Sequence, residues 1–398
     1  MRESYTGRRN RTSRRRRGFP LFLAGLILGL AVGAALYFTG LLPDRAAKEP
    51  KTPQEQTNPE PADPTPVDPT PVDPEPVDPT PVDPEPTDPD GYEKIELTGE
   101  QEQYETTYRI GDTGFEMFTY LPEVAEKYAA AVNSAAEKLQ GLADVYVVMV
   151  PLSSGVTLPD ELLGSQPFGD QKRAEEGVTS MLGDQVRTVP LYNVLMSHRT
   201  EYIYFRTDHH WTALGAYYGY RAFCEAKGIT PHELTDYREE EFSGFLGTFY
   251  QNSNKNKQMG DNPDTVVAYH PVTTTARLVF TDMNGQETPW MIIYPVESWS
   301  ADSKYNTFIG GDKPYTIITN PEVEDDSACV VVKDSFGNAM VPYLVDHYHT
   351  VHVIDYRYWN GDLTAFVRES GAKDVLFINN LSSIRNSFLM GRLREMIG

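Results

Sequence analysis

The chain contains few cysteines: only Cys224 and Cys329 occur in 398 residues. Two cysteines exclude both a multi-disulfide framework and a zinc cluster built from several thiolates. Each lies in an apolar run, which favours two buried free thiols. A single bridge between them remains compatible with an oxidising compartment.

Positive charge is scarce outside the N-terminus. The formal net charge of the chain is −22, yet residues 1–17 contain eight arginines and one glutamate, a local charge of +7. The rest of the chain therefore carries −29. Because such an acidic surface repels phosphate polymers, we expect no nucleic-acid partner.

Only one long uninterrupted apolar run occurs, at Phe19–Leu42, and it carries no charge. About twenty apolar residues suffice for a helix to cross a bilayer. The arginines directly before this run keep the N-terminus inside the cell. We therefore expect a basic cytoplasmic tail at residues 1–18, a transmembrane helix at residues 19–42 and an extracytoplasmic C-terminal part. The alternative is a cleaved signal peptide, but its apolar region would be shorter.

Residues 43–91 are rich in proline and acidic side chains. The unit Asp-Pro-Thr-Pro-Val recurs from Asp63, with glutamate in place of threonine at Glu75 and Glu85. Proline at this density prevents helix and sheet and favours the extended polyproline II conformation. The segment is therefore expected to be a disordered, Pro-rich linker that holds the globular part, residues 92–398, away from the membrane.

Short apolar runs alternate with helical patterns in residues 92–398, which predicts an α/β fold with a doubly wound, mostly parallel sheet. We expect buried strands at residues 144–150, 330–332, 351–354 and 375–378. We expect helices at residues 121–142, 211–227, 338–345 and 384–397. Residues 231–325 are less periodic and are interpreted as an insertion with additional strands at Leu278–Phe280 and Met291–Tyr294.

One candidate functional segment is Asp208-His209-His210-Trp211-Thr212, between an aromatic strand-like stretch and a predicted helix that Thr212 would cap. A histidine at a helix N-terminus is held neutral and can accept a proton. A carboxylate two residues away can fix its tautomer, as in a hydrolase triad. Two alternatives remain open, a metal site and a purely structural helix entrance.

A second segment, Lys333-Asp334-Ser335-Phe336-Gly337-Asn338, follows a buried strand and precedes an apolar helix. A serine at a strand-to-helix turn presents its hydroxyl at the edge of the sheet. The N–H groups at the start of the helix can then form an oxyanion hole. The alternative is that Ser335 simply caps the helix.

These residues resemble the bacterial DHHW protein family over about residues 105–398. The resemblance rests on Tyr204–Tyr218, on Lys333–Pro342 and on Asp355–Tyr358. That family is in turn similar to the SGNH hydrolase-like domains of alginate O-acetyltransferases. The resemblance implies an SGNH-like fold with Ser335 as nucleophile, His210 as base and Asp208 as the residue that orients it.

Two features depart from the family pattern. Lys333 stands where SGNH enzymes usually have glycine, and one residue fewer separates the acid from the base. The oxyanion residues cannot be assigned by motif; Asn379 is a candidate, and a turn asparagine is its alternative. Arg357 would bind an anionic substrate or pair with Asp355. The supporting residues expected around the triad are His209, Trp211, Asp334, Arg357 and Asn379.

The function expected from the resemblance is that of an O-acetyltransferase or esterase acting on a cell-envelope or secreted polysaccharide. A membrane-bound protein would be the acyl donor. We expect no cofactor and no metal; a metal site at His347, His349 and His352 is disfavoured. The alternative function is a non-catalytic envelope-assembly or glycan-binding protein that keeps the fold.

Overall fold

The computed structural model describes residues 91–398. The expected cytoplasmic tail, the transmembrane helix and all of the linker but Gly91 lie outside the described residues and stay predictions. Within residues 91–398, no helix is long and apolar enough to cross a membrane.

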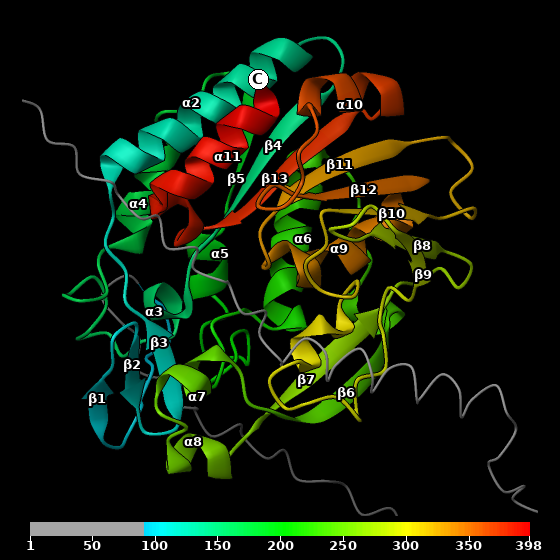
Figure 1. Cartoon of the computed structure of the whole chain (residues 1–398). Helices are drawn as coiled ribbons and strands as arrows, with labels where there is room; N and C mark the ends of the chain where they lie inside the picture. Colours follow the sequence, from blue (N-terminus) through cyan, green and yellow to red (C-terminus); the bar gives the residue numbers. More distant parts are fainter. Residues whose placement is uncertain (1–90) are drawn as a thin grey trace, which may run out of the picture. The chain divides into compact units, whose positions relative to one another are not determined.

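An eight-stranded mixed sheet forms the centre of the described part (Figure 1), with the strand order β5-β4-β13-β11-β12-β10-β8-β9. The first five strands are parallel to one another, and the last three pair antiparallel with their neighbours. In this order, the strands are β5 (Val186–Pro190), β4 (Asp144–Val150), β13 (Asp374–Asn380), β11 (Ala328–Lys333), β12 (Thr350–Asp355), β10 (Tyr315–Thr319), β8 (Arg277–Thr281) and β9 (Glu287–Trp290).

The central strands are buried on both faces. Every residue of β11 and β13 is buried, as expected for parallel strands that have helices on both sides. The prediction of a mixed α/β fold with a large, mostly parallel sheet is therefore confirmed. Cys224 and Cys329 are buried free thiols, as the sequence favoured.

Helices cover both faces of the sheet (Figure 1). One face holds α2 (Pro122–Leu139), α10 (Leu363–Ser370) and α11 (Ser387–Ile397), which contact one another. The opposite face holds α6 (Ala213–Lys227) and α9 (Gly337–Leu344). The shorter helices are α3 (Ser153–Val156), α4 (Gln171–Thr179), α5 (Tyr192–Met196), α7 (Thr248–Asn252) and α8 (Lys257–Asp261). Single 3₁₀ turns are η1 (Leu234–Asp236), η2 (Lys304–Thr307), η3 (Val345–His347) and η4 (Ser383–Arg385).

Two small antiparallel sheets accompany the central sheet. The first contains β1 (Gln101–Gln103), β2 (Thr107–Ile110) and β3 (Thr113–Glu116), and the second pairs β6 (Arg238–Phe245) with β7 (Asp264–His270). The less periodic region thus contributes β6 and β7 as a separate ribbon, whereas β8, β9 and β10 extend the central sheet.

The strand expected at Met291–Tyr294 is wrong. The observed strand, β9, ends at Trp290, and the next residues make only an isolated bridge between Ile293 and Phe308. Met291 is 50% exposed, whereas Ile293 is buried in the core. The run packs on the core as a loop, which an apolar pattern alone cannot distinguish from a strand.

Candidate active site

The loop before α6 carries the first candidate segment. An isolated antiparallel bridge joins Tyr204 to Trp211, so the chain folds back tightly there. The strand-like stretch at residues 202–205 contributes only this bridge and no longer strand. Thr212 caps α6, because its hydroxyl accepts a hydrogen bond from the N–H of Gly215. The predicted helix entrance is therefore confirmed, with His210 two residues before the cap.

A chain of hydrogen bonds joins this loop to the second segment. The Nε2 atom of His210 lies 2.8 Å from the hydroxyl of Ser335, and its Nδ1 atom lies 2.6 Å from a carboxylate oxygen of Asp208. Asp208 and His210 are buried, whereas Ser335 is partly exposed. The structure thus brings together all three residues expected to form the triad, although they are separated by up to 127 positions in sequence.

Asp208 is held by backbone groups as well as by His210. Its second carboxylate oxygen accepts a hydrogen bond from the N–H of Thr248 at 2.8 Å. Gly247 makes this approach possible, because a Cβ atom there would lie 2.2 Å from the carboxylate. Burial alone would raise the pKa of Asp208, but the imidazoles of His209 and His210 and the hydrogen bonds outweigh it. The pKa of Asp208 is therefore well below its usual range, and the carboxylate stays ionised.

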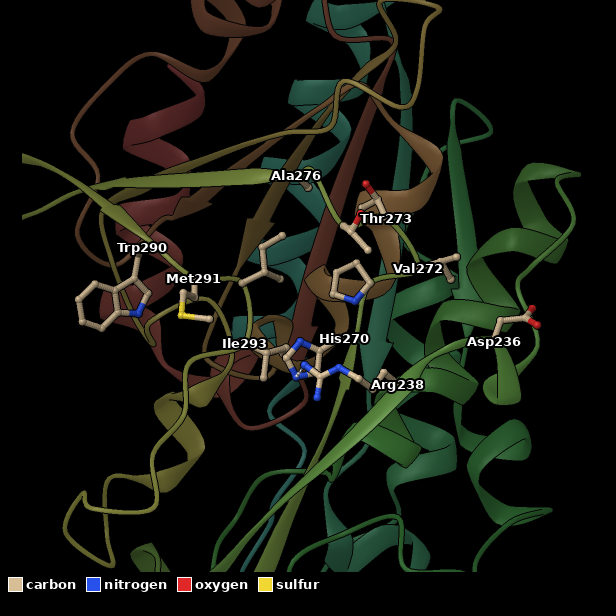
Figure 2. A pocket seen from close by; sticks show the side chains of 12 residues that line it. Asp236, Arg238, His270, Val272, Thr273, Ala276, Trp290, Met291 and Ile293 are labelled. Atoms are coloured by element: carbon tan, nitrogen blue, oxygen red, sulfur yellow. Dashed lines mark hydrogen bonds between the residues drawn. The ribbon is translucent and has the colours of Figure 1, made fainter. Parts of the chain in front are cut away.

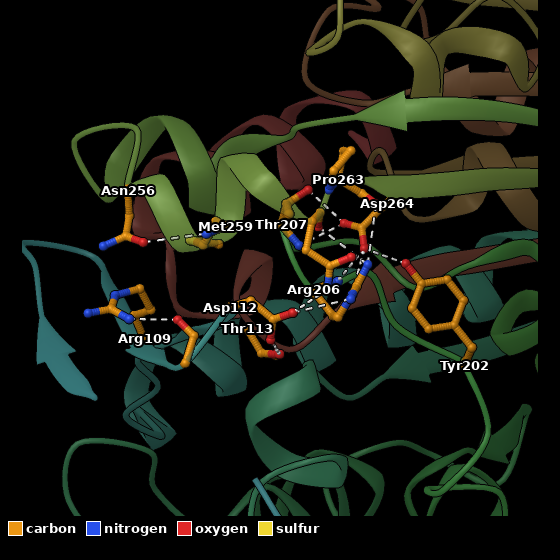
Figure 3. Close-up of polar contacts among 12 residues, drawn as sticks. Arg109, Asp112, Thr113, Tyr202, Arg206, Thr207, Asn256, Met259, Pro263 and Asp264 are labelled. Carbon is orange, nitrogen blue, oxygen red and sulfur yellow. Dashed lines mark hydrogen bonds and ion pairs between the residues drawn. The ribbon is translucent and has the colours of Figure 1, made fainter. Parts of the chain in front are cut away.

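The buried carboxylate of Asp264, on β7, holds the residues just before Asp208 in position (Figure 3). Asp264 is fully buried and accepts hydrogen bonds from the N–H of Thr207 at 2.7 Å and from its hydroxyl at 2.6 Å. It also accepts from the hydroxyl of Tyr202 and pairs with Arg206 at 3.1 Å. Sequence reasoning missed this residue, because Asp264 lies in the region that lacked a clear pattern.

The turn between β11 and α9 presents Ser335. The carboxylate of Asp334 accepts hydrogen bonds from the N–H of Phe336 at 3.0 Å and from that of Asn380 at 2.9 Å. The first bond lies within the turn, and the second joins the turn to the end of β13. Asp334 therefore stabilises the turn that carries Ser335.

The N–H groups around Ser335 differ from the expectation. Those of Phe336, Gly337 and Asn338 are all engaged, with Asp334 or with the carbonyl of Ser335. Within residues 91–398, the N–H of Ser335 itself has no hydrogen-bond partner. An oxyanion hole formed by free N–H groups of the helix is therefore wrong, and the N–H of the serine is the backbone donor that remains.

Aromatic packing fixes the orientation of the imidazole. Tyr305 stacks on His210 with ring centroids 3.9 Å apart, and its hydroxyl donates to the carbonyl of Ser335 at 3.0 Å. Trp211 donates its indole N–H to the carbonyl of Phe336 at 2.9 Å. Tyr305 and Trp211 therefore link the two segments directly. Trp211 was expected; Tyr305, in the 3₁₀ turn η2, carried no sequence signal.

Lys333 and Arg357 belong to a buried ion-pair network under the serine turn. Arg357 makes a two-bond pair with Asp355, at 2.8 and 2.6 Å, and a further contact with Asp312 at 2.7 Å. Lys333 lies 2.9 Å from each of these two carboxylates. Of the two roles considered for Arg357, the structure shows the pairing with Asp355. The lysine that replaces glycine in the motif is therefore neutralised by charge pairing.

Asn379 is buried inside β13. Its side-chain oxygen accepts a hydrogen bond from the hydroxyl of Tyr128 at 3.1 Å. Its side-chain nitrogen is buried without a partner among the described residues. Asn379 lies in a strand, so the turn alternative is wrong, and its role as an oxyanion donor stays a prediction.

Potential metal ligands do gather at the site. Among the described residues, Asp208, His209 and His210 form a group whose ligand atoms lie within 4.8 Å of one another. However, the hydrogen bonds to His210 and Thr248 already occupy both oxygens of Asp208. A metal bound here would have to break the hydrogen bonds that join Asp208 and His210 to Ser335, so these residues fit a triad better.

The other candidate metal ligands each have a different hydrogen-bond partner. His347, His349 and His352 bond to Tyr220, Val323 and Tyr315, respectively.

Two cavities lie in the described part of the chain near these elements. One, of about 390 Å³, is lined by His209, Thr248, Glu116, Arg385 and neighbouring residues, and so lies next to the triad. The other, of about 440 Å³ (Figure 2), lies between β6, β7 and the β8–β9 region and is lined by Arg238, His270 and Trp290. None of the three triad residues lines either cavity, but His209 of the first cavity is the neighbour of both Asp208 and His210.

Solved structures that match with TM-scores above 0.5 share the architecture of this chain. A DHHW family protein from Eubacterium siraeum is 29% identical, with a TM-score of 0.67 over 76% of this chain and 100% of that chain. Bacillus cereus PatB1, solved with a sulfonyl adduct, is 18% identical, with a TM-score of 0.59 over 72% and 97% of the two chains. The O-acetyltransferase domain of Pseudomonas putida AlgJ is 11% identical, with a TM-score of only 0.41 over 74% and 98%.

The family assignment comes from the sequence. A search of curated proteins finds no match to the chain. The model of the family described as DHHW protein matches residues 77–354, well over half of the chain. The chain therefore belongs to the DHHW protein family.

Proposed function

We propose that the chain is a membrane-anchored, extracytoplasmic acyl-ester enzyme that acts on a cell-envelope or secreted polysaccharide. Its reaction is O-acetyl transfer or ester hydrolysis, carried out by Ser335, His210 and Asp208. The observation that carries this proposal is the continuous chain of hydrogen bonds from the Ser335 hydroxyl through His210 to Asp208. An isolated capping serine would have no reason to contact a buried, carboxylate-oriented imidazole.

The reaction has two steps. The oxygen of Ser335 attacks the carbonyl carbon of the acyl ester, and Nε2 of His210 takes the serine proton and passes it to the departing alcohol. This leaves an acyl-serine. A sugar hydroxyl, or water in the hydrolytic case, then gives its proton to His210 and attacks the acyl-serine carbonyl. The acyl group leaves as a new ester or as a carboxylic acid, and Ser335 recovers its proton.

Asp208 and the Ser335 N–H would assist this chemistry. The ionised carboxylate accepts the Nδ1–H of His210, which keeps Nε2 free to take a proton and stabilises the imidazolium that forms. The partnerless N–H of Ser335 is available to the oxygen that becomes negative in the transition state. The acyl donor would be a second, membrane-bound protein, because the substrate polymer lies outside the cytoplasm.

The proposal is tested by acyl transfer in the purified full-length chain. Detergent-solubilised protein should release 4-nitrophenol from 4-nitrophenyl acetate, and added oligosaccharides should gain acetyl esters detectable by mass spectrometry. Ser335→Ala should lower both activities by about 10³-fold or more. If the wild-type chain shows neither activity with any ester or oligosaccharide, the alternative of a non-catalytic envelope-assembly or glycan-binding protein is favoured.

A further inference from the structure

The cavity beside His209 adjoins the residues that hold the triad. His209 lines this cavity, and its ring lies 3.9 Å, centroid to centroid, from that of His210. Thr248, which also lines it, donates its backbone N–H to Asp208. A ligand in the cavity would therefore rest against the residues adjoining the triad.

The lining is dominated by groups that hydrogen-bond to hydroxyls. Thr106 and Thr248 contribute exposed hydroxyl groups, and Asn252 contributes an amide that already contacts Thr106 at 3.2 Å. Phe249 adds an apolar surface. A few polar groups beside an aromatic surface are typical of a small-molecule site, and this combination suits a sugar ring.

Two lining residues carry buried polar atoms that make no hydrogen bond within the part of the chain that the structure describes, the hydroxyl oxygen of Thr107 and Nδ1 of His209. The His209 atom lies 3.6 Å from a carboxylate oxygen of Asp208, so it faces the triad. The side chain of His209 is 28% exposed, so the rest of its ring is open to the cavity.

The charges of the cavity disfavour anions. Arg385 is the one Lys or Arg among the described lining residues, and it pairs with Glu116 at 3.2 Å. Ser382 also donates to this carboxylate. Glu105 is exposed and has no ion pair among the described residues, so the two carboxylates and one guanidinium leave a net charge of −1. A uronate or phosphate group would be repelled here.

We propose that this cavity is the acceptor subsite and that it takes an uncharged sugar unit in preference to a uronate. The assignment rests on the proposed function, because it places the acceptor beside the proposed triad. Thr106, Asn252 and His209 hydrogen-bond to the hydroxyls of the sugar, and Glu105 excludes acidic sugars. The selected acceptor is therefore a neutral hexose or N-acetylhexosamine polymer.

The test is a titration of the full-length Ser335→Ala chain, which cannot turn over, with two probes followed by saturation-transfer NMR. The probes are triacetylchitotriose, which is uncharged, and trigalacturonate, which is anionic. The uncharged probe should bind more tightly. Asn252→Ala should weaken its binding by roughly fivefold, the effect of losing one or two hydrogen bonds.

A charge reversal tests the selectivity. Glu105→Lys should strengthen trigalacturonate binding by roughly threefold, since it replaces a repulsive charge at the rim by an attractive one. Glu369→Lys, an equal change of charge on an exposed residue of α10, should leave it unaltered. The proposal is overturned if the two variants behave alike, or if trigalacturonate binds as tightly as triacetylchitotriose.

Different results would contradict the acceptor subsite and the proposed catalytic function. Covalent labelling of Ser335 by a fluorophosphonate, with no effect of Asn252→Ala on binding, would contradict the subsite alone. Binding of triacetylchitotriose that Asn252→Ala weakens, in a chain that never labels, would support the cavity and contradict the proposed catalysis.

Discussion

At the scale of single residues, the three triad side chains differ in exposure in the way that the proposed chemistry needs. Asp208 is 4% exposed and His210 7%, whereas Ser335 is partly open to solvent. Burial strengthens the pairing between carboxylate and imidazole, because water does not compete for it. The nucleophile stays accessible to a polymer. This division favours a reacting serine over a structural one.

Single and double substitutions should show that the triad acts as a unit. Ser335→Ala and His210→Ala should each lower kcat by about 10³-fold or more, and the double variant should be hardly worse than either, because both remove the same proton transfer. His209→Ala should cost much less, since His209 does not contact Ser335. Circular dichroism checks that each variant is folded. Fully additive losses would contradict a joint role.

A buried glutamate should make stability depend on pH. Glu175 in α4 is 6% exposed and accepts hydrogen bonds from the N–H groups of Leu191 and Tyr192. Burial raises the pKa of Glu175 from its usual 4.5 to about 7. Between pH 4.5 and about 7, Glu175 is therefore protonated in the folded chain and ionised in the unfolded chain. The free energy of unfolding that this protonation contributes is present at low pH and is lost as pH rises towards 7.

Glu175→Gln should remove that contribution. The free energy of unfolding, from urea titrations between pH 4.5 and 7.5, should fall less steeply with pH in the variant than in the wild type. The difference should reach roughly 3 kcal/mol across the range. Parallel pH profiles for the two proteins would show that Glu175 is ionised in the folded chain.

At the scale of elements, the loop before α6 and the turn after β11 supply the site residues. Elements distant in sequence keep this loop and this turn in position. Asp264 at the start of β7 binds the backbone and hydroxyl of Thr207, one residue before Asp208. Asp264→Asn would turn an N–H₂ group towards donors and leave them unpaired. We expect a loss of about 3 kcal/mol in unfolding free energy, with a lower kcat.

The matched control for that variant is Asp261→Asn. Asp261 ends α8, is 63% exposed in its side chain and, among residues 91–398, pairs only with the exposed Lys257, so the same chemical change should cost less than about 0.5 kcal/mol. Urea denaturation measures both. Equal effects of the two variants would mean that Asp264 does not hold the loop.

Local sequence patterns predicted the elements that carry the triad residues. They did not predict the residues that contact those elements and hold them in position. The strand at 144–150, the Thr212 cap and the Ser335 turn each have a signal within a few residues, so sequence reasoning found them. Asp264, Gly247 and Tyr305 act across dozens of residues, and no local pattern reports a packing partner. The expected strand at Met291–Tyr294 was wrong because an apolar run can also cover a loop.

At the scale of the whole molecule, we propose a membrane anchor at residues 19–42, a linker at residues 43–91 and an external enzyme at residues 92–398. Protease added to intact protoplasts should remove residues 92–398 and leave the arginine-rich N-terminal tail, because in the proposed topology only the tail lies on the cytoplasmic side. Immunoblotting with antibodies against each end reports the outcome. Protection of the C-terminal part until the membrane is lysed would contradict the external location.

The most direct test of the central claim is covalent labelling of Ser335. The full-length chain, treated with a fluorophosphonate, should gain one adduct by intact-mass spectrometry, and peptide sequencing should place it on Ser335, because His210 activates that hydroxyl. His210→Ala should slow labelling by about 10²-fold or more. No adduct on folded wild-type protein, or equal labelling of Ser335→Ala, would contradict the account.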